Sequence, residues 1–130
     1  MTDPPLILVV DDEVHIVHVV SLKLQNAGFE LVTASNGQEG LDAAAQVKPD
    51  LIITDYKMPF VSGLEMCTKL REQEVTCDIP AIMLTARGFS IAPELLEQTN
   101  IQVVLSKPFS PRDILARVQM LIDQRRSDAA

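Results

Sequence analysis

The chain has 130 residues, which suits one ordinary domain, and 47% of them are hydrophobic, as in packed globular proteins. Its net charge of −7 disfavours direct binding to nucleic acid, which needs a basic face for phosphate contacts. No apolar run approaches the roughly 20 residues of a membrane span, and the N-terminus MTDPP lacks the pattern of a signal peptide, so the cytoplasm is the expected compartment.

Short apolar runs alternate with amphipathic segments along the first half of the chain. Continuous runs such as LILVV are typical of strands that are covered on both faces. Gly28 is well placed to follow the end of a helix, and Asn36 caps the next helix, with Glu39 completing a capping box. The predicted elements are a strand at 6–10, a helix at 13–27, a strand at 30–34, a helix from 36 to about 46 and a strand at 51–54.

The second half continues the same alternation. Ser62 and Glu65 form a second capping box, while Ser110 and Pro111 mark the start of the last helix. The predicted elements are a helix from 62 to about 73, a strand at 81–84, a short helix at 92–98, a strand at 102–105 and a helix from 110 onwards. Five successive strand–helix units predict a parallel sheet with helices on both faces. Residues 1–130 are expected to form a single domain with a core at about 5–125.

Side chains that can do chemistry stand at the ends of the predicted strands. Three carboxylates gathered there would repel one another unless a cation intervened, and Mg²⁺ takes oxygen ligands. An aspartate can also be a nucleophile towards a phosphoryl group, whose charge a lysine and a metal would neutralise beside a hydroxyl donor. The alternative is that each of these residues only caps a loop, but this does not explain why all four strand ends carry groups that can do chemistry. The residues are Asp11, Asp12, Asp55, Thr85 and Lys107.

The motifs that contain these residues have a familiar order. VVDDE, ITDYKMP, MLTA and SKPF follow one another with the spacing of a response-regulator receiver domain of two-component signalling, and the chain resembles the single-domain, chemotaxis-regulator-like form over about residues 5–125. The resemblance implies a flavodoxin-like, doubly wound α/β fold. It has five parallel strands in the order 2-1-3-4-5 and five helices on both faces.

The resemblance also implies roles for individual residues. Asp55 would accept a phosphoryl group from a histidine kinase or phosphotransfer protein, Thr85 would move towards that group, and Lys107 would pair with it. The Lys107–Pro108 peptide bond would be cis. The Mg²⁺ ligands implied by the family are Asp12 directly, Asp11 mainly through water, Asp55 and the backbone carbonyl of Lys57.

One departure from the family concerns the switch position. Val104 stands three residues before the lysine, where the family usually has an aromatic residue. A valine does not swing between exposed and buried rotamers as an aromatic ring does, so a shift of the fourth helix would have to report phosphorylation. In the same region, Phe89 and Ile91 either pack under a shortened helix or mark a partner surface.

Two cationic residues are candidates for controlling how long a phosphoryl group stays on Asp55. Lys57 and Arg87 lie two residues beyond Asp55 and Thr85 respectively. Cations there could hold phosphoryl oxygens and obstruct water, which predicts a slowly hydrolysing aspartyl-phosphate. The alternative is that both are ordinary surface cations that balance an acidic rim.

The remaining candidates are weaker. His15 and His18 lie three apart on the first helix, but no further ligand is evident nearby, so a solvated face is expected. Cys67 and Cys77 are expected to be reduced thiols. Four arginines of the last helix form a solvated face or contribute to a dimer or partner contact on the side of the fourth helix, fifth strand and fifth helix. They are Arg112, Arg117, Arg125 and Arg126.

Taken together, the sequence predicts a phosphorylation-controlled switch that catalyses only its own phosphorylation and dephosphorylation. It would act on a downstream protein target or in an onward phosphorelay. One alternative is a Mg²⁺-dependent phosphatase of the haloacid-dehalogenase type, but that class needs a second aspartate where Lys57 stands. Another is a phosphorylation-independent docking module, against which the intact Asp55, Thr85 and Lys107 argue.

Overall fold

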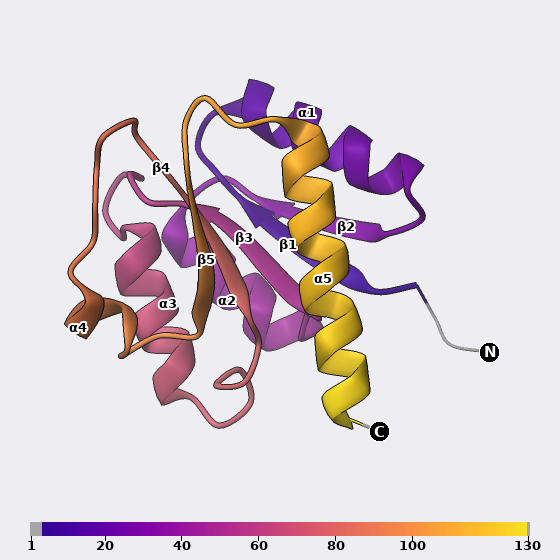
Figure 1. Ribbon diagram of the computed structural model, residues 1–130. Helices are drawn as coiled ribbons and strands as arrows, with labels where there is room; N and C mark the ends of the chain where they lie inside the picture. The colour runs from indigo at the N-terminus through magenta and orange to yellow at the C-terminus, as the bar shows by residue number, and fades with distance from the viewer. Residues whose placement is uncertain (1–3, 130) are drawn as a thin grey trace.

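The computed structural model describes residues 4–129, which form a five-stranded parallel sheet between two layers of helices (Figure 1). The strand order is β2-β1-β3-β4-β5, which confirms the predicted topology. The elements follow one another as β1 (Leu6–Val10), α1 (Val14–Asn26), β2 (Glu30–Ala34), α2 (Gly37–Val47), β3 (Leu51–Asp55), α3 (Gly63–Glu72), β4 (Ala81–Thr85), α4 (Pro93–Leu96), β5 (Ile101–Ser106) and α5 (Pro111–Ala129).

The core has two apolar layers because successive strand residues point to opposite faces of the sheet. On one face, residues such as Ile53 pack with α1 and α5, and on the other, residues such as Leu8 pack with α2 and α3. Figure 1 shows α5 on the near face and α2 on the far face. The central strands β3 and β4 are buried along their whole length, as their continuous apolar runs predicted.

Two helix starts test the predicted capping boxes. At Ser62 both reciprocal hydrogen bonds with Glu65 are present, which confirms that box. At Asn36 only half of the prediction is right: its side chain accepts from the N–H of Glu39 at 2.9 Å. The Glu39 carboxylate accepts instead from the backbone N–H and the hydroxyl of Ser35, at 2.9 and 2.7 Å, because Ser35 offers it two donors. These hydrogen bonds lower the pKa of Glu39.

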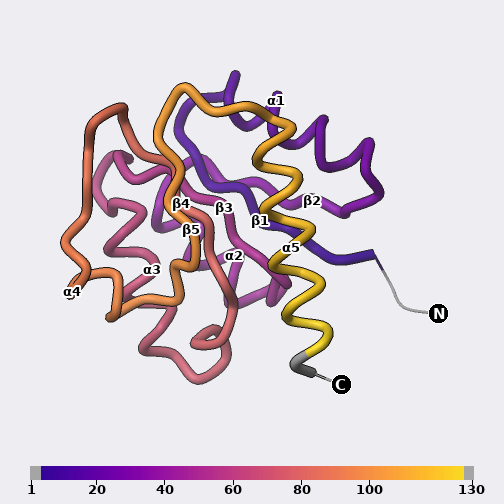
Figure 2. The backbone as a smooth tube through the Cα atoms, viewed as in Figure 1, coloured from indigo at the N-terminus to yellow at the C-terminus, as the bar shows by residue number. Residues whose placement is uncertain are grey.

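The fourth helix is shorter than predicted. It covers only Pro93–Leu96, and none of these residues is buried. The Thr99 hydroxyl donates to the carbonyl of Leu96 at 2.7 Å and accepts from the N–H of Ile101 at 3.1 Å, so the chain turns into β5. Figure 2 shows α4 at the edge of the molecule, on the side away from α1. The edge strand β5 alternates between half-buried and exposed residues.

Both cysteines are free thiols, as expected, with Cys67 buried and Cys77 half-buried. Burial raises the pKa of Cys67 to about 12. Within residues 4–129, no helix combines the length and the apolar character that crossing a bilayer requires.

Candidate functional site

Three carboxylates meet where β1 and β3 end. The two strands are parallel neighbours, with Val10 opposite Thr54, so the residues that follow Val10 lie close to Asp55, the last residue of β3. One carboxylate oxygen from each of Asp11, Asp12 and Asp55 lies within 4.8 Å of the other two. Asp11 and Asp55 are buried, whereas Asp12 is exposed. In the described part of the chain, this is the one cluster of three or more such side chains that could hold a metal ion.

Asp11 is the deepest of the three carboxylates, at 2% exposed. Its Oδ1 accepts a hydrogen bond from the N–H of Glu13 at 2.9 Å, but its buried Oδ2 has no hydrogen-bond partner in the structure. Burial raises the pKa of Asp11 to about 6, with a smaller contribution from the Asp55 charge and against the opposing hydrogen bond from Glu13. A buried polar atom without a partner is costly, and a hard cation would supply the partner that Oδ2 lacks.

Lys107 faces the carboxylates from the end of β5. Its Nζ lies 3.4 Å from Oδ1 of Asp55 and 3.5 Å from Oε1 of Glu13. Burial raises the pKa of Asp55, against the opposing attraction of Lys107. Burial opposes the charge on Lys107 as well, but the attraction of the surrounding carboxylates outweighs it and raises the pKa of Lys107. Sequence reasoning missed Glu13, although it stands directly after the two aspartates in VVDDE.

Thr85 completes this end of the sheet as the last residue of β4. It is 1% exposed, and its hydroxyl oxygen is buried without a hydrogen-bond partner in the structure. Its carbonyl accepts from the N–H of Lys107 at 2.8 Å, which joins the ends of β4 and β5. The Lys107–Pro108 bond is cis, as expected.

A cavity of about 850 Å³ opens beside the acidic cluster. Among the residues that line it, Tyr56 and Phe89 have ring centroids 4.6 Å apart with an interplanar angle of 42°. Phe89 therefore contacts the residue after Asp55, an arrangement that neither sequence-based alternative for Phe89 described. Lys57 lines the cavity, whereas Arg87 is exposed and is not among the lining residues. The lining consists of Asp12, Glu13, Asp55, Tyr56, Lys57, Met58, Pro59, Ala86, Phe89 and Lys107.

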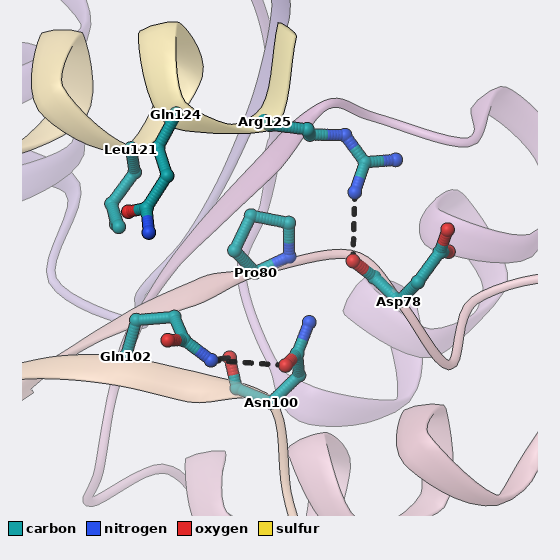
Figure 3. A pocket seen from close by; sticks show the side chains of 7 residues that line it. All are labelled: Asp78, Pro80, Asn100, Gln102, Leu121, Gln124 and Arg125. Carbon is teal, nitrogen blue, oxygen red and sulfur yellow. Dashed lines mark hydrogen bonds between the residues drawn. The ribbon is translucent and has the colours of Figure 1, made fainter. Parts of the chain in front are cut away.

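A second cavity, of about 470 Å³, lies at the opposite end of the sheet, where β4 and β5 begin (Figure 3). Its polar groups bond to one another: Gln102 donates to the Asn100 side chain at 3.0 Å, and Arg125 donates to the carbonyl of Asp78 at 2.7 Å. The guanidinium of Arg125, expected on a solvated face or at a partner contact, thus also ties α5 to the segment before β4. The lining of this cavity includes one carboxylate, that of Asp78, whereas the acidic cluster lies at the other end of the sheet.

The remaining candidates lie outside the acidic cluster. His15 and His18 are exposed on α1, and neither belongs to the group of potential metal ligands. Val104 lies on β5 and is 38% exposed.

Comparison with known proteins shows which family the chain is similar to. The sequence model of the family described as response regulator receiver domain matches residues 7–119. The alkaline phosphatase synthesis transcriptional regulatory protein PhoP of Bacillus subtilis (strain 168) is 40% identical over 124 residues, which are 95% of this chain and 50% of that protein. The chain thus spans about half the length of the curated relatives it matches.

Solved structures of similar proteins have the same fold. Chemotaxis protein CheY4 of Vibrio cholerae is 33% identical, with a TM-score of 0.80 over 91% of this chain and 98% of that chain. The receiver domain of a sensor histidine kinase from Pseudomonas aeruginosa PAO1 is 25% identical, with a TM-score of 0.82 over 92% of this chain and 98% of that chain. That structure has a magnesium ion coordinated in its active-site cleft.

Proposed function

The chain belongs to the response regulator receiver family and is a phosphorylation-controlled switch of two-component signalling, and on this premise we propose that Asp55 is the phosphoacceptor. One observation carries the proposal. The Asp55 carboxylate, 5% exposed at the end of β3, lies both in the cluster with Asp11 and Asp12 and 3.4 Å from Lys107. The Asp55 carboxylate, a potential nucleophile, thus lies beside a lysine and a potential metal site, both of which would attract a negatively charged phosphoryl group.

The chemistry assigned to these residues follows from their charges. An oxygen of Asp55 attacks the phosphorus of the donor, and the leaving group departs with the electron pair of the bond that breaks. The ammonium group of Lys107 offsets the charge on the phosphoryl oxygens. The Thr85 hydroxyl, which lacks a partner in the structure, supplies a hydrogen bond to one of them.

The acidic cluster also fits Mg²⁺. The fit rests on the three gathered carboxylates and on the unpartnered Oδ2 of Asp11. The residues that would hold the ion are Asp11, Asp12, Asp55 and, through its backbone carbonyl, Lys57. When bound, the ion supplies positive charge that offsets both the carboxylates and the phosphoryl oxygens. The magnesium ion in the similar receiver domain from Pseudomonas aeruginosa supports this assignment.

The partners follow from the family. Receiver domains interact with histidine kinases, and we assign the phosphodonor here to a histidine kinase or a phosphotransfer protein in the cytoplasm, where free thiols such as Cys67 persist. Residues 1–130 would act as one receiver unit on a downstream protein target or in a phosphorelay, catalysing only their own modification. The side formed by α4, β5 and α5 would supply a dimer or target contact. Each of these elements exposes a large apolar side chain, namely Leu95, Val104 and Met120.

The element that reports phosphorylation would be α4 with the loop before it. Val104 is too short to act as a swinging aromatic switch. By contrast, α4 has only four residues, none of them buried. Segments with few buried contacts open and shift at little free-energy cost. Movement of Thr85 towards the phosphoryl group would therefore be transmitted along the chain that leads from β4 to α4.

The experiment that tests this function is intact-mass measurement after incubation with acetyl phosphate and Mg²⁺. The protein is expected to gain one phosphoryl group, and EDTA is expected to prevent the gain. An Asp55→Asn variant controls for the position of the modification. No gain in a folded protein that binds Mg²⁺ would contradict the proposal and favour a docking module. Continued turnover of a small phosphoester such as p-nitrophenyl phosphate would favour the phosphatase alternative.

The lifetime of the phosphorylated state is a separate prediction. Lys57 lines the cavity beside Asp55, and Arg87 follows Thr85 in the next loop. If these cations hold phosphoryl oxygens and obstruct water, Lys57→Ala and Arg87→Ala will each speed dephosphorylation a few-fold. The measurement is the decay of the phosphorylated mass after removal of the donor.

A matched control for the lifetime prediction is Lys69→Ala. Lys69 is an exposed cation in the last turn of α3 and does not line the cavity. Its removal changes the net charge by the same amount but should leave the decay rate unchanged. Unchanged rates in both Lys57→Ala and Arg87→Ala would show that the two residues are ordinary surface cations.

A further inference from the structure

The cavity beside Asp55 has two chemically different ends. Its charged lining residues suit a phosphoryl group and are Asp12, Glu13, Asp55, Lys57 and Lys107. The rest of its wall is mainly apolar, contributed by Tyr56, Met58, Pro59, Ala86 and Phe89. At about 850 Å³ the cavity is far larger than a phosphoryl group needs, and it falls within the range of sites for small organic molecules.

The apolar end lies on the open side of the cavity. Asp55 is 5% exposed, whereas Phe89 is 42% exposed, so Phe89 lies nearer to the solvent than the carboxylate does. In phosphoryl transfer the attacking and leaving groups lie roughly in line on opposite sides of the phosphorus. A leaving group on a phosphorus held at Asp55 would therefore point away from the carboxylate into the cavity that Tyr56 and Phe89 help to line.

We propose that this apolar end binds the leaving group of the phosphodonor and that Phe89 selects donors whose leaving group is planar and apolar. The inference rests on the proposed role of Asp55 as phosphoacceptor. The Tyr56 and Phe89 rings contact each other at 4.6 Å and line the same cavity, so they offer an aromatic wall against which a flat group can pack. Phe89 acts on donor choice, while Asp55 carries the covalent chemistry.

The transfer step balances for a simple pair of donors. With benzoyl phosphate, an Asp55 carboxylate oxygen forms a bond to phosphorus while the bond between phosphorus and the benzoate oxygen breaks. The leaving benzoate keeps the electron pair of that bond. Acetyl phosphate undergoes the same exchange but releases acetate. The two donors therefore share the mixed anhydride and the phosphoryl group and differ in the aromatic ring.

The experiment compares the rates at which the 130-residue chain is phosphorylated by benzoyl phosphate and by acetyl phosphate in the presence of Mg²⁺. The ratio of the two rate constants is measured by intact mass for the wild type and for each variant. Because the intrinsic reactivity of each donor is the same with every variant, it cancels when ratios are compared. Phe89→Ala is expected to lower the ratio about five-fold, within the range of about two- to twelve-fold that one aromatic contact contributes.

Two further variants separate stacking from other effects. Phe89→Tyr keeps the ring and should retain the wild-type ratio. Phe60→Ala removes a neighbouring aromatic residue that is 98% exposed and does not line the cavity, and it should also retain that ratio. An unchanged ratio in Phe89→Ala, or an equal fall in Phe60→Ala, would overturn the inference. A wild-type protein that accepts no phosphoryl group from either donor would overturn the assignment of Asp55 itself.

Discussion

Asp55→Asn is expected to abolish phosphoryl uptake completely while raising the melting temperature of the metal-free protein at neutral pH. The amide cannot act as the carboxylate nucleophile. The stability gain follows from the pKa of Asp55, which is raised in the fold by burial despite the attraction of Lys107. The folded protein therefore holds this proton more tightly than the unfolded chain, and ionisation costs stability as the pH rises through the carboxylate range. Intact mass and thermal unfolding in EDTA measure the two effects.

Asp42→Asn makes the same chemical change at a distance from the site. Asp42 is exposed on α2, where its side chain accepts from Gln38 at 3.1 Å. This variant should retain phosphoryl uptake and change the free energy of unfolding by less than about 0.5 kcal/mol. Phosphoryl uptake by Asp55→Asn at the wild-type level would contradict the assignment of the phosphoacceptor, and a lower melting temperature would contradict the cost assigned to its charge.

Gly63→Ala is expected to destabilise the protein by about 3 kcal/mol, the upper end of the usual cost of overpacking, because the atoms that the added Cβ meets are mainly backbone. Gly63 is the first residue of α3, and a Cβ atom there would overlap the carbonyl oxygen of Asp55 and lie 3.0 Å from Oγ1 of Thr54. The N–H of Gly63 also donates to the carbonyl of Tyr56 at 2.8 Å. Backbone therefore blocks the added methyl group, and any adjustment displaces the phosphoacceptor. Urea unfolding measures the stability, and intact mass measures the phosphoryl uptake.

Gly40→Ala provides the matched comparison within a helix. The atom closest to an added Cβ at Gly40 is Sδ of Met66, at 2.6 Å, followed by a methyl carbon of Val10 at 3.1 Å. Methionine is flexible and can give way, and alanine gains about 1 kcal/mol over glycine in helix propensity. The cost of Gly40→Ala should therefore stay below about 1.5 kcal/mol. Equal losses in the two variants would contradict the close approach of α3 to the end of β3.

The strands were predictable because a strand that is buried on both faces has an almost wholly apolar sequence. The runs LILVV and LIITD lie between helices on both sides, so almost every residue had to be apolar, and no long-range information was needed to recognise them. The length of α4 was not predictable in this way. It depends on the side-chain hydrogen bonds of Thr99, which become visible only once the chain has turned towards β5.

The acidic cluster was predictable for a related reason. Parallel strands end at the same edge of a sheet, so aspartates that follow apolar runs had to come together. The contact between Tyr56 and Phe89 was not predictable, since it joins two loops whose paths are set by packing rather than by local sequence. The ion pair of Glu13 with Lys107 lies between these two cases. The sequence shows that Glu13 stands beside the two aspartates, but it does not show that the Glu13 side chain points towards Lys107.

The aromatic contact over the cavity has an optical consequence. Tyr56 is the only tyrosine of the chain, which has no tryptophan, so ultraviolet emission from the folded protein comes almost entirely from this one ring. That ring is the neighbour of Asp55 and lies 4.6 Å from Phe89. The protein therefore carries its own spectroscopic probe in the lining of the cavity beside Asp55, and fluorescence from the unlabelled chain reports the surroundings of a single, known position.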